Sequence, residues 1–152
     1  SSSSSSSSSS QGMALLSLSY MMRHLSQAVL VSHLPALLPL IVVSLRAGLT
    51  DLRLSTLITL HQLLQEGAGW LQSHATSVVS ALLWLGRDPD STKIRCLALR
   101  CLEVLTTLPF HLLFPLQTQV LLGLAECLDD KKRVVRREAV RCRNKWHTLS
   151  KQ

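Results

Sequence analysis

The chain has 152 residues, a net charge of +7 and 47% apolar residues, of which few are aromatic. This length fits a single domain, and the basic balance favours a partner that carries acidic groups. The nine acidic residues leave little for catalysis by paired carboxylates. The sequence also lacks a phosphate-binding glycine loop, a GxSxG serine motif and an HExxH zinc motif, so an enzyme is the class of protein that it supports least.

The N-terminal part contributes little to the expected fold. The first ten residues are all serine, and a serine homopolymer cannot bury a core. The segment GMALLSLSYMMRH, residues 12–24, stands where the second helix of a repeat unit is expected, with no first helix before it. We therefore predict a partial unit at residues 11–31, and we expect the chain to be the C-terminal part of a longer protein.

The most apolar window covers residues 28–45 and is expected to be a core helix. Its longest unbroken apolar run, residues 34–43, contains Pro35 and Pro39, and His33 lies in the same window. A membrane-spanning helix needs about 18 or more consecutive apolar residues. We therefore predict a buried helix at residues 34–46 and no membrane span.

A repeat of 41 to 42 residues organises the rest of the chain. The segment TKIRCLALRCLEVL, residues 92–105, matches the later segment RVVRREAVRCRNKW, residues 133–146. It also matches the earlier segment DLRLSTLITLHQLL, residues 51–64. Within each segment the apolar positions i, i+4, i+7 and i+11 form one helical stripe. Further apolar segments precede them at residues 34–46, 76–86 and 116–128, and short polar turns join each pair.

A helix–turn–helix unit of this length is typical of HEAT-type repeats, since it matches their period. The sequence therefore predicts an all-α fold, a HEAT-type α-solenoid with three helix pairs and a partial N-terminal unit. We place the complete units at residues 32–73, 74–114 and 115–152, the last as a terminal cap. Asp88 and Asp129 each precede an arginine, Arg95 and Arg136, by seven residues, which indicates a structural ladder of charges along the stack.

The cysteines and histidines do not form a metal-binding pattern. No CxxC pair occurs, and Cys96 and Cys101 are five residues apart, which separates them by about 140° around a helix. Cys101 and Cys142 occupy a small position of the apolar stripe, where a buried thiol packs well. We therefore expect no metal, no cofactor and no disulfide framework, and a reducing compartment.

The last predicted helix is strongly basic. Residues 131–145 hold eight of the sixteen lysines and arginines, and Glu138 is their only acid. Compared with the preceding unit, Leu97 is replaced by Glu138 and Leu102 by Arg143, as expected for a terminal unit without a neighbour on its outer side. The cations at residues 131–133, near the start of the helix, exceed what a cap requires and indicate a partner.

Three segments resemble a known family. They are LDDKKRVVRREAV at residues 128–140, LPALLPLIVVSL at residues 34–45 and IRCLALRCLEVLTTLP at residues 94–109. They are similar to the C-terminal HEAT-repeat region of the MMS-sensitivity and nucleotide-excision-repair scaffold of the cytosolic iron–sulphur cluster targeting complex. The final residues, HTLSKQ, depart from the ending of the mammalian members.

The resemblance implies a non-catalytic binding platform in the cytoplasm and nucleus. In that family the C-terminal repeats hold a small cluster-carrier subunit, which binds a WD-repeat propeller protein. The complex delivers clusters to apo-proteins such as DNA helicases and polymerases. The charge of the last helix makes it the expected partner-binding site, with these residues: Lys132, Arg136, Arg137, Arg141, Arg143 and Lys145, supported by Trp146.

Two other functions remain open at the level of sequence. The basic helix could bind nucleic acid, although no tyrosine or phenylalanine is interleaved with the charges and no base-reading pattern is visible. It could also bind an acidic transport or adaptor protein. A protein partner is favoured over DNA, because most of the charge is accounted for by the end of a solenoid.

Overall fold

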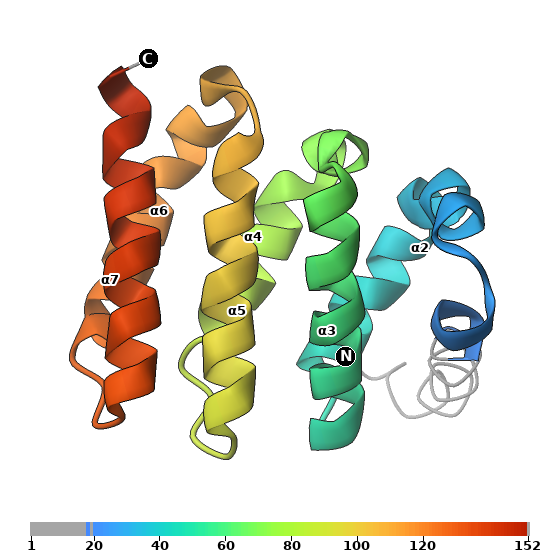
Figure 1. The fold of residues 1–152 in the computed structure, drawn as a ribbon, viewed down its shortest axis with the longest axis horizontal. Coiled ribbons are helices and arrows are strands. Elements are labelled where there is room, and N and C mark those ends of the chain that lie inside the picture. The colour runs from blue at the N-terminus through green and yellow to red at the C-terminus, as the bar shows by residue number, and fades with distance from the viewer. Residues whose placement is uncertain (1–17, 19, 152) are drawn as a thin grey trace, which may run out of the picture.

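The helices of the chain lie in two layers, and the computed structural model describes residue 18 and residues 20–151 (Figure 1). The first helices of each pair are α2 (Gln27–Arg46), α4 (Ala75–Leu85) and α6 (Phe110–Leu128), and the second are α3 (Thr50–Glu66), α5 (Thr92–Val104) and α7 (Arg133–His147). Three short 3₁₀ helices lie between or after them: η1 (Gly69–His74), η2 (Leu105–Thr107) and η3 (Thr148–Lys151). The serine tract and residues 11–17 and 19 of the predicted partial unit lie outside the described residues.

Neighbouring helix pairs pack on one another in chain order. Each second helix packs against the second helix of the next pair, α3 on α5 and α5 on α7, while α4 packs between α2 and α6. No strand occurs within the described residues. The architecture is therefore all-helical and consistent with an α-solenoid, as predicted, and its assignment to the HEAT type stays a prediction.

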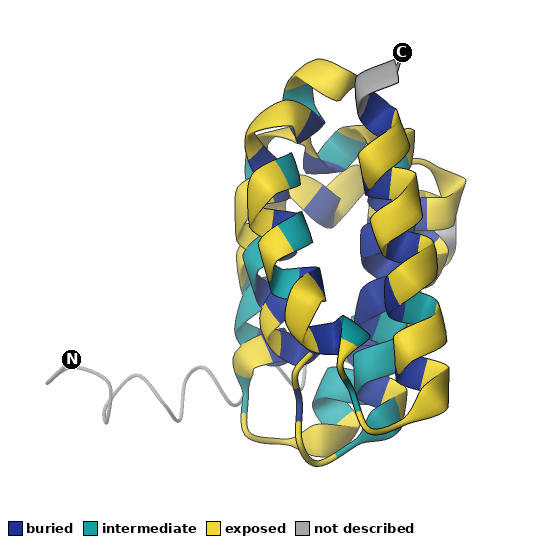
Figure 2. Cartoon of the chain, turned by 90° about the vertical axis from the view of Figure 1, so that its left-hand side faces the viewer, coloured by how far each residue is buried: buried dark blue, intermediate teal, exposed yellow. Residues whose placement is uncertain are grey.

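The core lies between the two layers, where the helices turn their buried residues toward one another (Figure 2). Two predicted apolar stripes are confirmed, on α5 with the first residue of η2 and on α7, where the following residues are buried: Ile94, Ala98, Cys101, Leu105, Val135, Ala139, Cys142 and Trp146. On α3 the predicted stripe is only partly buried. Burial of such side chains is the main driving force for helix packing, at roughly 25 cal/mol per Å² of apolar surface. The stripe therefore fixes how far each helix is rotated about its own axis.

Two of the first helices are longer than predicted, because their prolines lie inside them. α2 begins at Gln27 rather than at residue 34, and α6 begins at Phe110 rather than at residue 116. A proline in a helix removes one N–H donor and leaves the carbonyl four residues earlier without a helical partner. Pro35, Pro39 and Pro115 are all exposed, so water can satisfy these carbonyls and the helices continue.

α2 is the one described helix that is long and apolar enough to cross a membrane, by length and composition alone. Its candidate window, Ala28–Arg46, is 39% buried within the structure. Leu34, Leu38 and Ile41 pack into the core of the first pair. Packing against α3 and α4 thus accounts for part of the apolar composition of α2, and the absence of a membrane span stays a prediction.

Arginine–aspartate contacts link successive units at the turns. Arg53 of α3 pairs with Asp88 of the next turn at 2.9 Å, and Arg95 of α5 pairs with Asp130 of the turn after that at 3.3 Å. Both arginines are mostly buried, and Asp88 is only 4% exposed. Asp88 Oδ1 also accepts hydrogen bonds from the backbone N–H groups of Asp90 and Ser91, at 2.7 and 3.1 Å.

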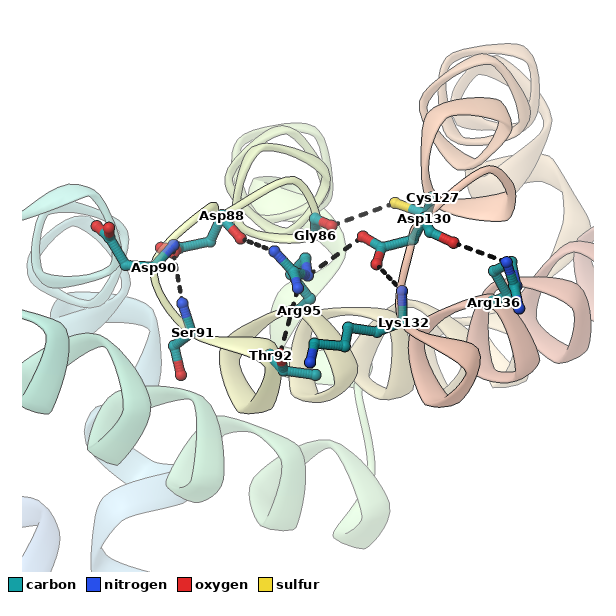
Figure 3. A network of polar contacts seen from close by, with 10 residues as sticks. All are labelled: Gly86, Asp88, Asp90, Ser91, Thr92, Arg95, Cys127, Asp130, Lys132 and Arg136. Atoms are coloured by element: carbon teal, nitrogen blue, oxygen red, sulfur yellow. Dashed lines mark hydrogen bonds and ion pairs between the residues drawn. The ribbon is translucent and has the colours of Figure 1, made fainter.

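These contacts correct the predicted ladder in two respects (Figure 3). Each arginine forms its ion pair with the aspartate of the following unit, while it donates to a backbone carbonyl of its own turn, as Arg95 does to Asp88. The acid in the last turn is Asp130, since Asp129 is exposed and makes no ion pair in the described structure. The ladder therefore connects units rather than stabilising each turn separately.

Candidate functional site

The position of α7 is set by its buried stripe, and Trp146 is part of that stripe. Trp146 is 0% exposed, and its indole Nε1–H donates to the carbonyl of Leu102 at 3.0 Å. Gln117 of α6 in turn donates to the Trp146 carbonyl at 2.7 Å. The indole is thus a core group enclosed by α5 and α6, and the predicted support of partner binding by Trp146 stays a prediction. Its role is to hold α7 in register.

The predicted basic residues are spread over three sides of α7. The stripe Val134, Glu138, Arg141 and Lys145 faces α5, as shown by ion pairs of Glu138 with Arg100 at 3.9 Å and of Arg141 with Glu103 at 4.0 Å. These two pairs are exposed and therefore contribute little to stability.

The other basic side chains of α7 point outward or toward the end of the array. Arg137 lies on the outward side of the helix with Arg133, four residues before it. Arg136 and Arg143 lie seven residues apart, on the side away from α5. The structure thus brings Arg141 and Lys145 together in one groove, and Arg141 also lines an open depression of about 720 Å³ on α7 with Arg133, Arg136 and Arg137. Arg143 lines neither of them.

The start of α7 tolerates its cations because an aspartate offsets them. Lys132 is the N-cap residue, and its backbone N–H donates to Asp130 Oδ1 at 2.8 Å. A carboxylate at this position satisfies a free N–H group and opposes the positive end of the helix dipole. Lys132 is exposed in this turn and does not line the groove across α3, α5 and α7.

An open groove of about 670 Å³ runs across α3, α5 and α7. Its polar and charged lining comes from all three helices: His61 and Gln65 on α3, Arg100 and Glu103 on α5, and Glu138, Arg141 and Lys145 on α7. Burial lowers the pKa of His61, and the nearby Arg100 lowers it further, so the imidazole is neutral at pH 7. The groove therefore offers fixed charges of both signs.

An apolar strip lies beside this groove on the same three helices. It surrounds a depression of about 520 Å³ and is formed by Leu54, Ile58, Cys96, Leu97 and Val134. Ile58 and Val134 are 45% and 52% exposed. An apolar centre bordered by charged side chains is the composition of a protein-binding surface. We define the groove and this strip together as the second-helix face.

Sequence reasoning missed the α3 and α5 part of the second-helix face. The repeat step itself carries the missing signal: His61, Glu103 and Lys145 follow one another at intervals of 42 residues, and all three line the groove. Charged residues at the same position of successive units lie on the same side of the stack. Only the charge density of α7 drew attention to the last unit.

The cysteines are placed as packing residues. Burial raises the pKa of the Cys127 thiol to about 11, and it raises the pKa values of Cys101 and Cys142 still further. These thiols stay protonated at neutral pH, whereas metal ligation and nucleophilic attack need the thiolate. Within residues 18 and 20–151, no group of histidine, cysteine and acidic side chains could hold a metal ion.

The chain is similar to one family of proteins over most of its length. A family model described as RNAPII transcription regulator C-terminal, MMS19_C, matches residues 1–106. The MMS19 nucleotide excision repair protein homologues of Xenopus laevis and Homo sapiens are 43% and 40% identical over 135 residues, 89% of this chain. The DNA repair/transcription protein mms19 of Schizosaccharomyces pombe is 34% identical over 88% of this chain. The chain spans only 13% of the length of each of these relatives.

Proposed function

Since the chain belongs to the MMS19 family, we propose that it is a non-catalytic scaffold module that holds a protein partner on its second-helix face. The observation that carries the proposal is the combination of an apolar strip and a groove with charges of both signs across α3, α5 and α7. The names of the relatives refer to DNA repair and transcription, and these two processes are the proposed context of the module.

The proposed partner is the small cluster-carrier subunit of the cytosolic iron–sulphur targeting complex. Through it the module would bind the WD-repeat propeller protein and help to deliver clusters to apo-proteins such as DNA helicases and polymerases, in the cytoplasm and the nucleus. This finer assignment is supported by the resemblance of the turn and helix at residues 128–140. The contacts we propose are made by Arg141 and Lys145 in the groove and by Arg137, which lines the neighbouring depression on α7 together with Arg141.

A protein partner is favoured over nucleic acid because acidic side chains interrupt the basic surface. Glu103 and Glu138 line the same groove as Arg100, Arg141 and Lys145. A phosphate backbone would be repelled by these carboxylates, whereas a protein can match both signs. Titration with a duplex DNA at physiological salt separates the two functions, because submicromolar binding with a steep salt dependence would favour the nucleic-acid alternative.

The proposed site is tested by charge reversal followed by co-purification. The triple variant Arg137→Glu, Arg141→Glu, Lys145→Glu should no longer co-purify with the carrier subunit, and binding to the unchanged chain should weaken as salt is raised. A matched control reverses three exposed cations elsewhere, Arg23, Arg46 and Arg87, with the same change in net charge. Undiminished binding of the first variant would refute the site.

A further inference from the structure

Trp84 lies on the outward side of α4, at the joint between the α2–α3 pair and the α4–α5 pair. It is 45% exposed, whereas Trp146 is enclosed. The guanidinium carbon of Arg53 lies 4.8 Å from the centroid of the Trp84 ring, so a cation covers one face of the indole. Arg53 is itself fixed by Asp88 and by the Ala47 carbonyl. The indole is therefore held on one face, and its exposed part is free to contact a partner.

A free positive charge lies close to Trp84. Arg46, the last residue of α2, donates from Nη2 to the hydroxyl of Ser80 at 3.3 Å. Ser80 precedes Trp84 by four residues, on the same side of α4. Arg46 is exposed, and no ion pair among the described residues includes it. Since a hydroxyl does not neutralise a guanidinium, Arg46 can still form a charge-assisted hydrogen bond with the carboxylate of a partner.

An apolar hollow continues this surface toward the middle of α2. Its volume is about 200 Å³, and it is lined by residues of α2, η1 and α4: Leu38, Pro39, Val42, His74 and Ser77. Val42 precedes Arg46 by four residues, and Ser77 precedes Trp84 by seven. The hollow, Arg46 and Trp84 therefore follow one another along the two helices, over a length of about 10 Å.

We define the first-helix groove as the hollow together with Arg46, Ser80 and Trp84. It runs between α2 and α4, which lie side by side in the layer behind α3 and α5 (Figure 1). Successive units of a solenoid stack along its axis, and this stacking leaves the outward side of the layer uncovered. The groove lies on the opposite side of the two layers from the second-helix face (Figure 2).

The composition of the groove favours an acidic segment of another protein. Tryptophan and arginine are the residues that most often dominate the energy of a protein interface. The hollow accepts an aliphatic side chain, the exposed indole surface accepts an apolar or planar one, and Arg46 lacks a carboxylate. A second copy of the chain is disfavoured as the occupant, because each copy carries a net charge of +7.

Nucleic acid matches the groove less well than a protein does. A base could stack on Trp84, but Arg53 is engaged by Asp88, so the groove offers the phosphates one free arginine. The apolar floor of the hollow suits an aliphatic side chain better than a second base. The observations therefore favour a polypeptide over a nucleic-acid strand.

We propose that the first-helix groove binds a short acidic segment of another protein. The segment places an aliphatic side chain in the hollow, a carboxylate on Arg46 and an apolar or planar side chain on the exposed surface of Trp84. The inference goes beyond the scaffold function proposed above, because it assigns a second partner surface on the other layer of helices. A module with both surfaces can hold two proteins at once, one on each side of the array.

The test selects the occupant from a defined library. Random peptides of about 12 residues, long enough to span the groove, are displayed on phage and selected on the whole chain after depletion on the Arg46→Glu variant. Arg46 is exposed and outside the core, so this variant should fold like the unchanged chain. We expect the selected peptides to share an aspartate or glutamate within about four residues of an aliphatic side chain, since this spacing matches the distance from Arg46 to the hollow.

A synthetic, fluorescein-labelled copy of a selected peptide is then titrated with the chain and followed by fluorescence anisotropy. Arg46→Gln should weaken binding about tenfold, because a hydrogen bond to a charged group is lost. Trp84→Ala should weaken it by at least about tenfold, and Trp84→Phe, which keeps a ring over Arg53, by less. The matched control Lys93→Gln has the same change in net charge, but Lys93 borders the second-helix face, so the affinity should stay within about twofold.

The indole N–H signals of the isotope-labelled chain locate the bound peptide without any substitution. Saturating peptide should shift the signal of the exposed Trp84 and leave that of the buried Trp146 unchanged. If Trp84 served only to shield the ion pair of Arg53 and Asp88, the peptide would not move its signal. An unmoved Trp84 signal, a library that yields no peptide after depletion, or equal affinity for Arg46→Gln and the unchanged chain would each overturn the inference.

Three further outcomes distinguish the two surfaces and the possible occupants. The variant reversed at Arg137, Arg141 and Lys145 should still bind the peptide, and Arg46→Glu should still co-purify with the carrier subunit, so either surface can fail without the other. If single-stranded DNA displaced the peptide at physiological salt and its binding required Arg46, nucleic acid would be the occupant and the inference would fail. Self-association in analytical ultracentrifugation that Arg46→Glu abolishes would assign the groove to a second copy instead.

Discussion

Asp88 is the residue at which the proposed joint between units can be tested most directly. It is 4% exposed, accepts two backbone hydrogen bonds in its own turn through Oδ1, and pairs with Arg53 of the preceding unit through Oδ2. Asp88→Ala removes all three contacts and leaves a mostly buried guanidinium without its anion. Loss of one partner of a buried pair costs about 3–5 kcal/mol.

Asp88→Asn separates the two roles of the carboxylate. The amide oxygen can still accept the N–H groups of Asp90 and Ser91, while the ion pair with Arg53 is lost. A hydrogen bond to a charged group contributes about 1.5–3 kcal/mol, so we expect the asparagine variant to lose about 2 kcal/mol. Combined with Arg53→Gln, the loss should be less than the sum of the two single losses, because both changes remove the same interaction.

The assay is urea unfolding followed by far-ultraviolet circular dichroism, with Asp90→Asn as the matched control. Asp90 is exposed in the same turn, so its replacement should change the free energy of unfolding by less than about 0.5 kcal/mol. A loss of about 1 kcal/mol or less for Asp88→Ala, or strictly additive losses for Asp88→Asn and Arg53→Gln, would refute the reasoning.

Two other predictions concern the buried side chains of the last two units. Trp146→Phe removes the donor to the buried Leu102 carbonyl and should cost about 1–3 kcal/mol, and Trp146→Ala about 3–5 kcal/mol, measured by the same unfolding assay. An unchanged free energy of unfolding in Trp146→Phe would contradict a stabilising hydrogen bond. Iodoacetamide should modify Cys96 first, slowly at pH 7 and faster as the pH approaches its raised pKa, because the thiolate is the reactive form. Cys101 and Cys142 are buried and should react only after unfolding. The order is measured by mass spectrometry of the native chain, and labelling of Cys101 as early as Cys96 would contradict the prediction.

Helical periodicity predicted the second helices closely and the first helices less well. α5 begins at Thr92 and α7 at Arg133, as the stripes indicated, because short polar turns mark both starts. The predicted starts of α2 and α6 are too late, since they lie next to Pro35 and Pro115, and both prolines are inside the helices. A proline can remain inside a helix where its side of the helix is exposed, and exposure of that side depends on the fold.

The sequence also predicted the charge ladder but not its connections. An arginine seven residues after an aspartate suggested a contact within one turn, whereas the ion pairs span 35 residues between units. Which of two adjacent aspartates, Asp129 or Asp130, faces Arg95 depends on the backbone of the turn, and residue type does not distinguish them. The candidate site was predicted as one basic helix for a similar reason: charge density is visible in a sequence, but the sides of α7 become distinct only once Val135 and Trp146 have fixed its rotation.

The packing of each helix pair against its immediate neighbours has a mechanical consequence. Extensive packing joins α3 to α5 and α5 to α7, and the ladder joins the same neighbours. A load applied to the end of such a stack passes through its joints in series, so the most compliant joint yields first and the compliances of successive joints add. A partner bound at α7 can therefore alter the geometry of α3 only by bending both joints. The stiffness of the contacts at Asp88 and Asp130 determines how much of the distortion is transmitted to α3.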